Sequence, residues 1–326
     1  MTDRQSAPET TEESPLVVAL FAAAALAWTA AMIWSARQDI TARADAMSEV
    51  TAAAYALPGI VAAELVAGAA AALLVLTLIA RRRPLGATAR FAVATGTGLL
   101  IGAASAVPMF TINTAGTIYA AIGGTLAAAG TIGGALAGFR VPSVVVAAGS
   151  AAVAVFVIGT VLNYSPVQSP LLSLLGADDT ASTVAASQWF SYGQATISGL
   201  AAGIITFLLL RRSGRRTGTT PRWTMHAAAG AGPGVILVAG EILSRTAGSK
   251  VLDLAGKVSI LEQTTQQILS AARLNSGLVV LFIGAISAII LVGRTLEPAD
   301  DSDSSEDEDE DQVSESSSET AYHSNS

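Results

Sequence analysis

A run of 49 consecutive residues without one charged side chain constrains this chain more than any other feature. Residues 91–139 contain no Asp, Glu, Lys or Arg, and neither do residues 180–210 or 274–293. A helix needs about 20 apolar residues to cross a hydrocarbon core about 30 Å thick. The longest run can therefore form two membrane spans joined by a tight turn, and we expect an integral membrane protein in a lipid bilayer.

The remaining apolar runs predict an all-α, polytopic transmembrane helical bundle of about eight spans. Charged residues make up only 13% of the chain and hydrophobic residues 52%, whereas soluble domains carry about 25% charged residues. The seventh predicted span is the least regular, because His226, Pro233 and Glu241 interrupt it. In chain order the predicted spans are 15–35, 58–80, 91–112, 115–138, 142–162, 193–210, 223–242 and 276–293.

The basic residues predict which ends of the spans face the cytoplasm. With the N-terminus inside, the cytoplasmic segments hold 12 basic residues and the external segments hold six. Cytoplasmic loops of membrane proteins carry an excess of Lys and Arg. We therefore expect both termini in the cytoplasm and a plasma-membrane location, and the composition, rich in Arg and Ala and poor in Lys, indicates a prokaryotic source. The predicted external loops are 36–57, 163–192 and 243–275.

The two ends of the chain differ in character from the membrane body, 15–294. We expect residues 1–14 and 295–326 to be disordered and cytoplasmic, because such sequences cannot bury enough apolar surface to fold. Between Glu297 and Glu319 lie 12 of the 25 acidic residues, which leaves 13 against 18 basic residues, or +5, for the rest. The acidic tail is either a solubilising segment or a site of regulated contact with a basic partner.

The two halves of the chain resemble each other faintly. Arg90, before the third predicted span, matches Arg222, before the seventh, 132 positions later; Arg140 and Arg294, after the fourth and eighth spans, are 154 positions apart. Four spans per half would make the two copies of this 4+4 arrangement parallel, and parallel repeats are known among transporters. The alternative is that multi-pass proteins share arginine-rich inner loops without any duplication.

The predicted external loops contain amphipathic helices. Residues 40–54 are a loose case, and residues 251–273 place apolar residues four and three positions apart, as in a heptad seam. Such helices either lie on their own membrane domain or on the lipid surface, or they form a docking surface for a partner. The seam consists of Leu254, Val258, Leu261, Thr265, Ile268 and Ala272.

Three titratable residues in or near the predicted spans are candidates for a functional site. An ionisable group inside a membrane is a functional hypothesis by default, because it is costly to place there. Glu64 is the strongest candidate, as a proton carrier or cation contact, followed by Glu241 and His226. The alternative for Glu64 is a carboxyl that reaches the headgroups or pairs with Arg245 or Arg37.

Several classes of chemistry lack their residues. The chain has no Cys and two His, so we expect no metal site and no cofactor, since zinc and haem sites need several converging ligands. Nothing matches a metalloprotease HExxH, a serine nucleophile elbow or a phosphate-binding loop. We therefore expect neither an enzyme nor a nucleic-acid-binding protein.

Two functional classes remain. The first is a transport or permease protein for a small hydrophobic solute, suggested by the repeat, by the Gly- and Pro-rich spans and by Glu64. The second is a non-catalytic accessory or scaffold protein of a cell-envelope complex, which would dock through the external helices and the acidic tail. Its partner would be another membrane or envelope protein, or a second copy of the chain.

Overall fold

The structure is a computed structural model that describes residues 14–295, except for residues 44, 84, 114, 115, 140, 178, 219, 220 and 258. All regular structure in this part is helical, which confirms the all-α fold. Eight of the described helices are long and apolar enough to cross a membrane, as expected for a multi-pass membrane protein. The chain divides into two units, Met1–Val292 and Gly293–Ser326. The helical bundle is the first unit, and the predictions for the terminal segments lie outside the described residues.

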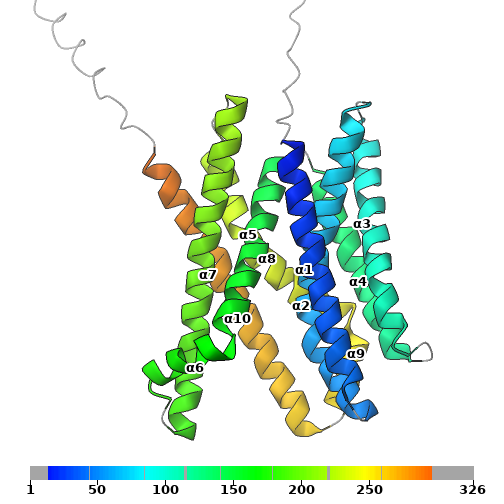
Figure 1. The fold of residues 1–326 in the computed structure, drawn as a ribbon, viewed down its shortest axis with the longest axis vertical. Helices are drawn as coiled ribbons and strands as arrows, with labels where there is room; N and C mark the ends of the chain where they lie inside the picture. The colour runs from blue at the N-terminus through cyan, green and yellow to red at the C-terminus, as the bar shows by residue number, and fades with distance from the viewer. Residues whose placement is uncertain are drawn as a thin grey trace, which may run out of the picture. The chain divides into compact units, whose positions relative to one another are not determined.

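Ten helices follow one another along the described chain (Figure 1). Two of them, α6 (Ser165–Leu174) and α9 (Ser249–Gly256), are too short to span a membrane. The eight long helices are α1 (Pro15–Thr41), α2 (Ala46–Ala80), α3 (Ala87–Phe110), α4 (Thr117–Ala137), α5 (Pro142–Leu162), α7 (Thr180–Thr217), α8 (Trp223–Thr246) and α10 (Ile260–Gly293).

Three helices extend well beyond the predicted spans. α2, α7 and α10 have 35, 38 and 34 residues, or about 50 Å each at 1.5 Å per residue, against a hydrocarbon core of about 30 Å. The predicted loops 36–57, 163–192 and 243–275 are therefore largely helical. Pro58, expected at the start of a span, lies inside α2.

Local caps explain where two of the long helices begin. The Asp45 carboxylate accepts a hydrogen bond from the Ser48 backbone N–H at 2.8 Å and so caps α2. Hydrogen bonds from the backbone and the side chain of Ser48 hold the pKa of Asp45 below its usual value. Asp179 and Ser182 form a capping box at the start of α7. At its other end α7 stops at Gly218, whose φ of 67° suits a residue without a side chain.

The heptad seam predicted over 251–273 does not form one helix. α9 ends at Gly256 and α10 begins at Ile260, where the Ser259 hydroxyl accepts a hydrogen bond from the Glu262 N–H at 3.0 Å. This cap overrides the apolar periodicity across the break. Val258 lies outside the described residues, and the Leu261 and Ile268 side chains are 77% and 64% exposed.

Closely packed glycines join α2, α3 and α4 into what we call the first block. A Cβ atom added to Gly130 in α4 would lie 2.5 Å from the Gly98 carbonyl oxygen and 2.9 Å from the Gly102 Cα atom, both in α3. A Cβ atom added to Gly68 in α2 would lie 2.9 Å from the Gly130 Cα atom. Close backbone approach through small residues is a main source of helix association in lipid, so Gly130 is the centre of this block.

The helices α7, α8 and α10 form a second block with the same arrangement. A Cβ atom added to Gly203 in α7 would lie 2.9 Å from the Gly284 carbonyl oxygen in α10, and one added to Gly230 in α8 would lie 2.9 Å from the Gly284 carbonyl carbon. Gly230 follows Gly98 by 132 positions and Gly284 follows Gly130 by 154. These are the spacings of the arginine pairs on which the proposed 4+4 repeat rests.

Helices α1 to α4 and helices α5 to α10, which we call the two halves of the bundle, meet through ring contacts and through a close approach at one glycine. The Trp28 ring in α1 stacks on the Phe156 ring in α5, with centroids 4.9 Å apart and planes 28° apart. Between α2 and α8, a Cβ atom added to Gly240 would lie 3.2 Å from the Ala62 Cβ atom. Helices α1, α2, α5 and α8 therefore form the boundary along which the halves are in contact.

Candidate functional site

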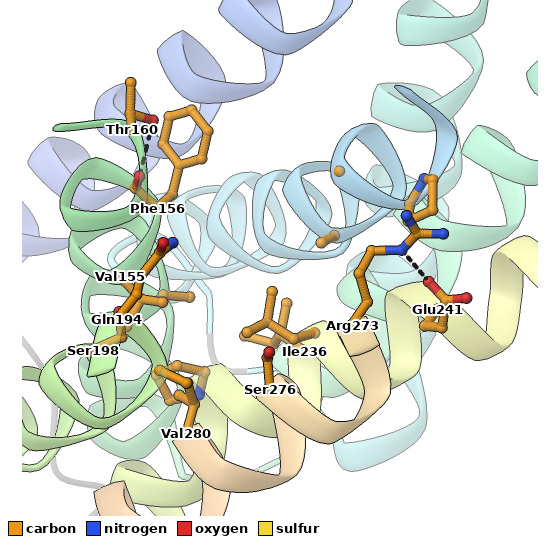
Figure 2. Close-up of a pocket in the computed structure, with 18 of the residues that line it drawn as sticks. Val155, Phe156, Thr160, Gln194, Ser198, Ile236, Glu241, Arg273, Ser276 and Val280 are labelled. Atoms are coloured by element: carbon orange, nitrogen blue, oxygen red, sulfur yellow. Dashed lines mark hydrogen bonds and ion pairs between the residues drawn. The ribbon is translucent and has the colours of Figure 1, made fainter. Parts of the chain in front are cut away.

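A cavity of about 630 Å³, which we call the apolar cavity, lies between helices of both halves. Small-molecule sites typically have volumes of about 300–1,000 Å³ and largely apolar walls with a few placed polar groups. Figure 2 shows that Phe156, Val155, Ile236 and Val280 surround it from α5, α8 and α10. Trp28 of α1 lines it as well. The cavity is therefore large enough for a small organic molecule.

Both proline-interrupted helices around this cavity present their proline to it. Pro58 in α2 and Pro233 in α8 line the apolar cavity. Proline has no N–H, so it cannot donate to the carbonyl group four residues earlier, which belongs to Ala54 in α2 and to Ala229 in α8. The helical hydrogen bonding of both walls is thus interrupted beside the cavity.

Polar side chains enter the apolar cavity from α5 and α7. Gln194 and Ser198 lie one turn apart on α7, and Thr160 lies opposite them on α5 (Figure 2). The Asn163 side-chain amide donates hydrogen bonds to the Gln194 Oε1 atom at 3.1 Å and to the Gly159 carbonyl at 2.8 Å. These groups can fix the orientation of a bound molecule.

A second cavity of about 630 Å³, which we call the polar cavity, shares one wall with the first. Pro58, Glu241 and Arg273 line both cavities. The polar cavity lies at the end of the bundle that holds α9, and its remaining lining is rich in charged and amide side chains. These are Arg245, Asp253, Lys257, Gln263, Gln266 and Gln267.

The shared wall contains a buried carboxylate held by groups from two helices. Glu241, 2% exposed, forms ion pairs with Arg273 Nε at 2.8 Å and with Arg245 Nε at 3.2 Å. The Ser270 hydroxyl donates a further hydrogen bond to Oε1 of Glu241 and accepts one from Arg245 Nε at 2.7 Å. We call these four residues the Glu241 cluster.

The spacing of these residues along each helix explains why they meet. Residues three or four apart in a helix share a face, as Glu241 and Arg245 do on α8 and Ser270 and Arg273 on α10. The two guanidinium groups against one carboxylate leave the cluster with a net charge of +1. The Arg245 side chain is 43% exposed and the Arg273 side chain 36%. Both are therefore accessible at the surface of the cluster, whereas the Glu241 carboxylate is not.

Glu64 lies apart from both cavities, buried inside the bundle. It is 0% exposed, and neither carboxyl oxygen has a hydrogen-bond partner among the described residues. The alternative that Glu64 reaches the headgroups or pairs with arginine is wrong, because Arg245 binds Glu241 and Arg37 donates to the Pro108 carbonyl.

His226 occupies a third, separate position. Its side chain is 4% exposed and its Nδ1 atom has no hydrogen-bond partner among the described residues. The imidazole centroid lies 5.8 Å from that of the Phe207 ring in α7. The structure therefore does not bring Glu64, Glu241 and His226 together into one site.

Of the three candidates, Glu241 lines the two cavities described above, and the sequence did not point to its principal partner. Arg273 lies 32 positions later in the chain, beyond the break between α9 and α10. The pairing of Glu241 with Arg245 four residues later was visible in the sequence. The excess of basic over acidic residues in the segment after Glu241 is the signal that could have pointed to a second basic partner.

Comparison with known proteins supplies no further assignment. What the chain does therefore has to be argued from its cavities, its buried carboxyl groups and its helix packing. No protein-family model, curated protein or solved structure matches the chain.

Proposed function

We propose that the chain is a transport protein that moves a small, largely hydrophobic solute through the apolar cavity. The observation that carries this proposal is the position of the cavity, enclosed by α5, α7, α8 and α10 against α1 and α2 and beside the prolines of α2 and α8. Transporters commonly place their substrate site where their repeats meet. The glycine packing supports the same reading, because equivalent contacts recur in the two blocks.

The lining of the cavity supports a cargo with a large apolar surface. Most of the lining residues are apolar, among them Trp28, Phe156 and Ile236. A strongly hydrated ion or sugar would lose its water shell in such surroundings without recovering the hydrogen bonds. An apolar body of modest size gains from the same burial.

We further infer that both termini face the cytoplasm of a prokaryotic cell and that the protein resides in the plasma membrane. Arg81–Arg83 follow the end of α2 and Arg211–Arg216 lie in the last turns of α7, at the end of the bundle where α1 begins (Figure 1). An arginine-rich end is the one expected to remain inside. The polar cavity would then open toward the outside.

Accessibility of single cysteines tests the proposed transport path. The chain contains no Cys, so Ser198→Cys, at the cavity wall, and Leu200→Cys, 45% exposed on the same helix, form a matched pair. We expect a membrane-impermeant thiol reagent to modify Ser198→Cys at least about tenfold faster than Leu200→Cys. Such a reagent reacts with the thiolate form, and a cysteine that faces hydrocarbon forms little thiolate. Mass spectrometry of reconstituted protein measures both rates.

The side from which the reagent arrives decides between transport and a static pocket. A carrier exposes its cavity to each side in turn, so the reagent should modify Ser198→Cys both from outside the vesicles and when trapped inside. Modification from one side alone would contradict a transport path. Equal, slow modification of both variants would show that the cavity is closed to water.

One observation favours the accessory-protein alternative. The first turns of α10 carry exposed Ile260 and Leu261, at 85% and 77%, and Ile268 at 64%, on a helix longer than the membrane is thick. Under this alternative a membrane or envelope protein, or a second copy, covers these side chains. A stoichiometric partner that co-purifies with the native chain, is lost on Leu261→Ser with Ile268→Ser and persists in cavity variants would favour it over transport.

A further inference from the structure

We propose that Arg273 exchanges Glu241 for the anionic group of an amphipathic organic anion, whose apolar body fills the apolar cavity. This inference rests on the proposed transport function and specifies its substrate class: an apolar molecule with one carboxylate, sulfonate or phosphate group. It places the anionic group at the wall between the two cavities and the apolar body among Phe156, Ile236 and Val280.

The hydrogen bonding of Arg273 leaves it able to hold such a group. Among the described residues, its Nε atom donates to Glu241 and neither Nη atom makes a hydrogen bond. The guanidinium group is a planar fork that binds carboxylates, sulfonates and phosphates through two parallel hydrogen bonds. Arg273 lines both cavities, so its free nitrogens can be reached from either one; Figure 2 shows it beside Glu241 in the apolar cavity.

The apolar cavity extends along α10 from this arginine. Ser276 lies three residues after Arg273 and therefore on the same face of the helix, and it too lines the cavity. Val280 follows one turn later, with Ile236 across from it on α8. An occupant thus meets a cation and a hydroxyl donor at one end of the cavity and mainly apolar walls further along, where Gln194 and Ser198 of α7 are the polar groups (Figure 2).

The contacts and the net charge of the Glu241 cluster favour the binding of an anion over that of a cation. A cationic ligand would have to displace two guanidinium groups and the Ser270 hydroxyl from one buried carboxylate. An anion has to displace only the carboxylate from Arg273, and Glu241 keeps Arg245 and Ser270 as partners. Because the cluster carries a net charge of +1, a bound monoanion also brings it to neutrality.

A pair of matched fluorescent probes tests the substrate class. Anilinonaphthalene sulfonate and phenylnaphthylamine share one ring system and differ in the sulfonate group, so their difference in binding measures the anion contact. The full chain in lipid nanodiscs is titrated with each probe, and binding to empty nanodiscs is subtracted. We expect saturable binding of both probes, tighter for the sulfonate, and loss of both on filling the cavity with Ser198→Phe.

Two substitutions in the cluster should act on the sulfonate in opposite directions. Arg273→Gln should weaken sulfonate binding about tenfold, the effect of one charge-assisted contact, with little change for phenylnaphthylamine. Glu241→Gln should tighten sulfonate binding several-fold, because the internal competitor for Arg273 loses its charge. Arg273→Lys keeps the charge without the fork, and is expected between the native chain and Arg273→Gln.

The outcomes separate this inference from the proposed function on which it rests. Binding of both probes that is blocked by Ser198→Phe but indifferent to Arg273→Gln would leave the cavity in place and overturn the anion site. Failure of either probe to bind in a saturable way would overturn the cavity as a ligand site. A loss of sulfonate binding in both Arg273→Gln and Glu241→Gln would mean that the cluster is structural.

Discussion

Gly98→Ala is expected to lower the free energy of unfolding by roughly 1–3 kcal/mol, the usual effect of overpacking a tight contact. The added Cβ atom would lie 2.8 Å from the Gly134 Cα atom and closer still to the Gly130 carbonyl oxygen, and both belong to the α4 backbone. Neither can move without shifting the helix, so α3 and α4 must separate. Titration of the reconstituted chain with a denaturing detergent, followed by circular dichroism, measures the change.

Gly96→Ala is the matched control, two residues away on the same helix. A Cβ atom at Gly96 meets nothing within 4 Å, and Ala stabilises a helix over Gly by roughly 0.5–1 kcal/mol. We therefore expect no loss of stability, or a small gain. Gly230→Ala should resemble Gly98→Ala if the second block is built like the first. Equal effects at Gly96 and Gly98 would contradict the tight contact between α3 and α4.

Dicyclohexylcarbodiimide is expected to modify Glu64 and to leave Glu241 unmodified. The reagent is apolar, enters bilayers and adds to the protonated form of a carboxylic acid. Glu64 is 0% exposed without a hydrogen-bond partner among the described residues, and an unpaired carboxylate there would be costly. Glu241 is paired with two guanidinium groups, which occupy its oxygens. Peptide mass spectrometry of the labelled chain distinguishes the two sites.

Glu64→Gln should abolish this labelling without loss of the fold, because glutamine has nearly the same volume as a protonated glutamic acid and is also uncharged. The variant also tests a proton-carrying role, since transport coupled to a proton gradient would stop while binding of the neutral probe persisted. Labelling of Glu241 in preference to Glu64 would contradict the arrangement described above. If Glu64→Gln left gradient-driven transport intact, Glu64 would have no part in coupling.

The helical class and the eight long apolar helices could be predicted from the sequence, but the ends of the helices could not. Long apolar runs without charge are expected to cross a bilayer as helices, so the sequence predicts spans such as the one near 91–112. The ends depend on local caps such as Asp45 and Ser259, which extend α2 and split α9 from α10. Apolar periodicity alone does not reveal such caps, and the periodicity over 251–273 therefore predicts one continuous seam.

The functional site was predicted only in part, because its contacts join distant segments. Glu241 was noticed as a charge in an apolar stretch, and Arg245 is its neighbour on the same helix face. The approach of Arg273 and Ser270 depends on how α10 crosses α8, which glycine contacts such as Gly230 with Gly284 determine. Glu64 stands out in the sequence as a charge within an apolar span, but only the packing shows that it has no cation partner among the described residues.

The glycine contacts also bear on where this bundle can deform. Backbones in contact at Gly130 and at Gly284 cannot slide past each other without losing their fit, so each block is a stiff body. The contact between the halves includes side-chain pairs such as the Trp28 and Phe156 rings, which can slip over one another and refit. We therefore expect a relative motion of the halves to cost less than a rearrangement within either block, and such a motion would shift α1 and α2 against the other walls of the apolar cavity.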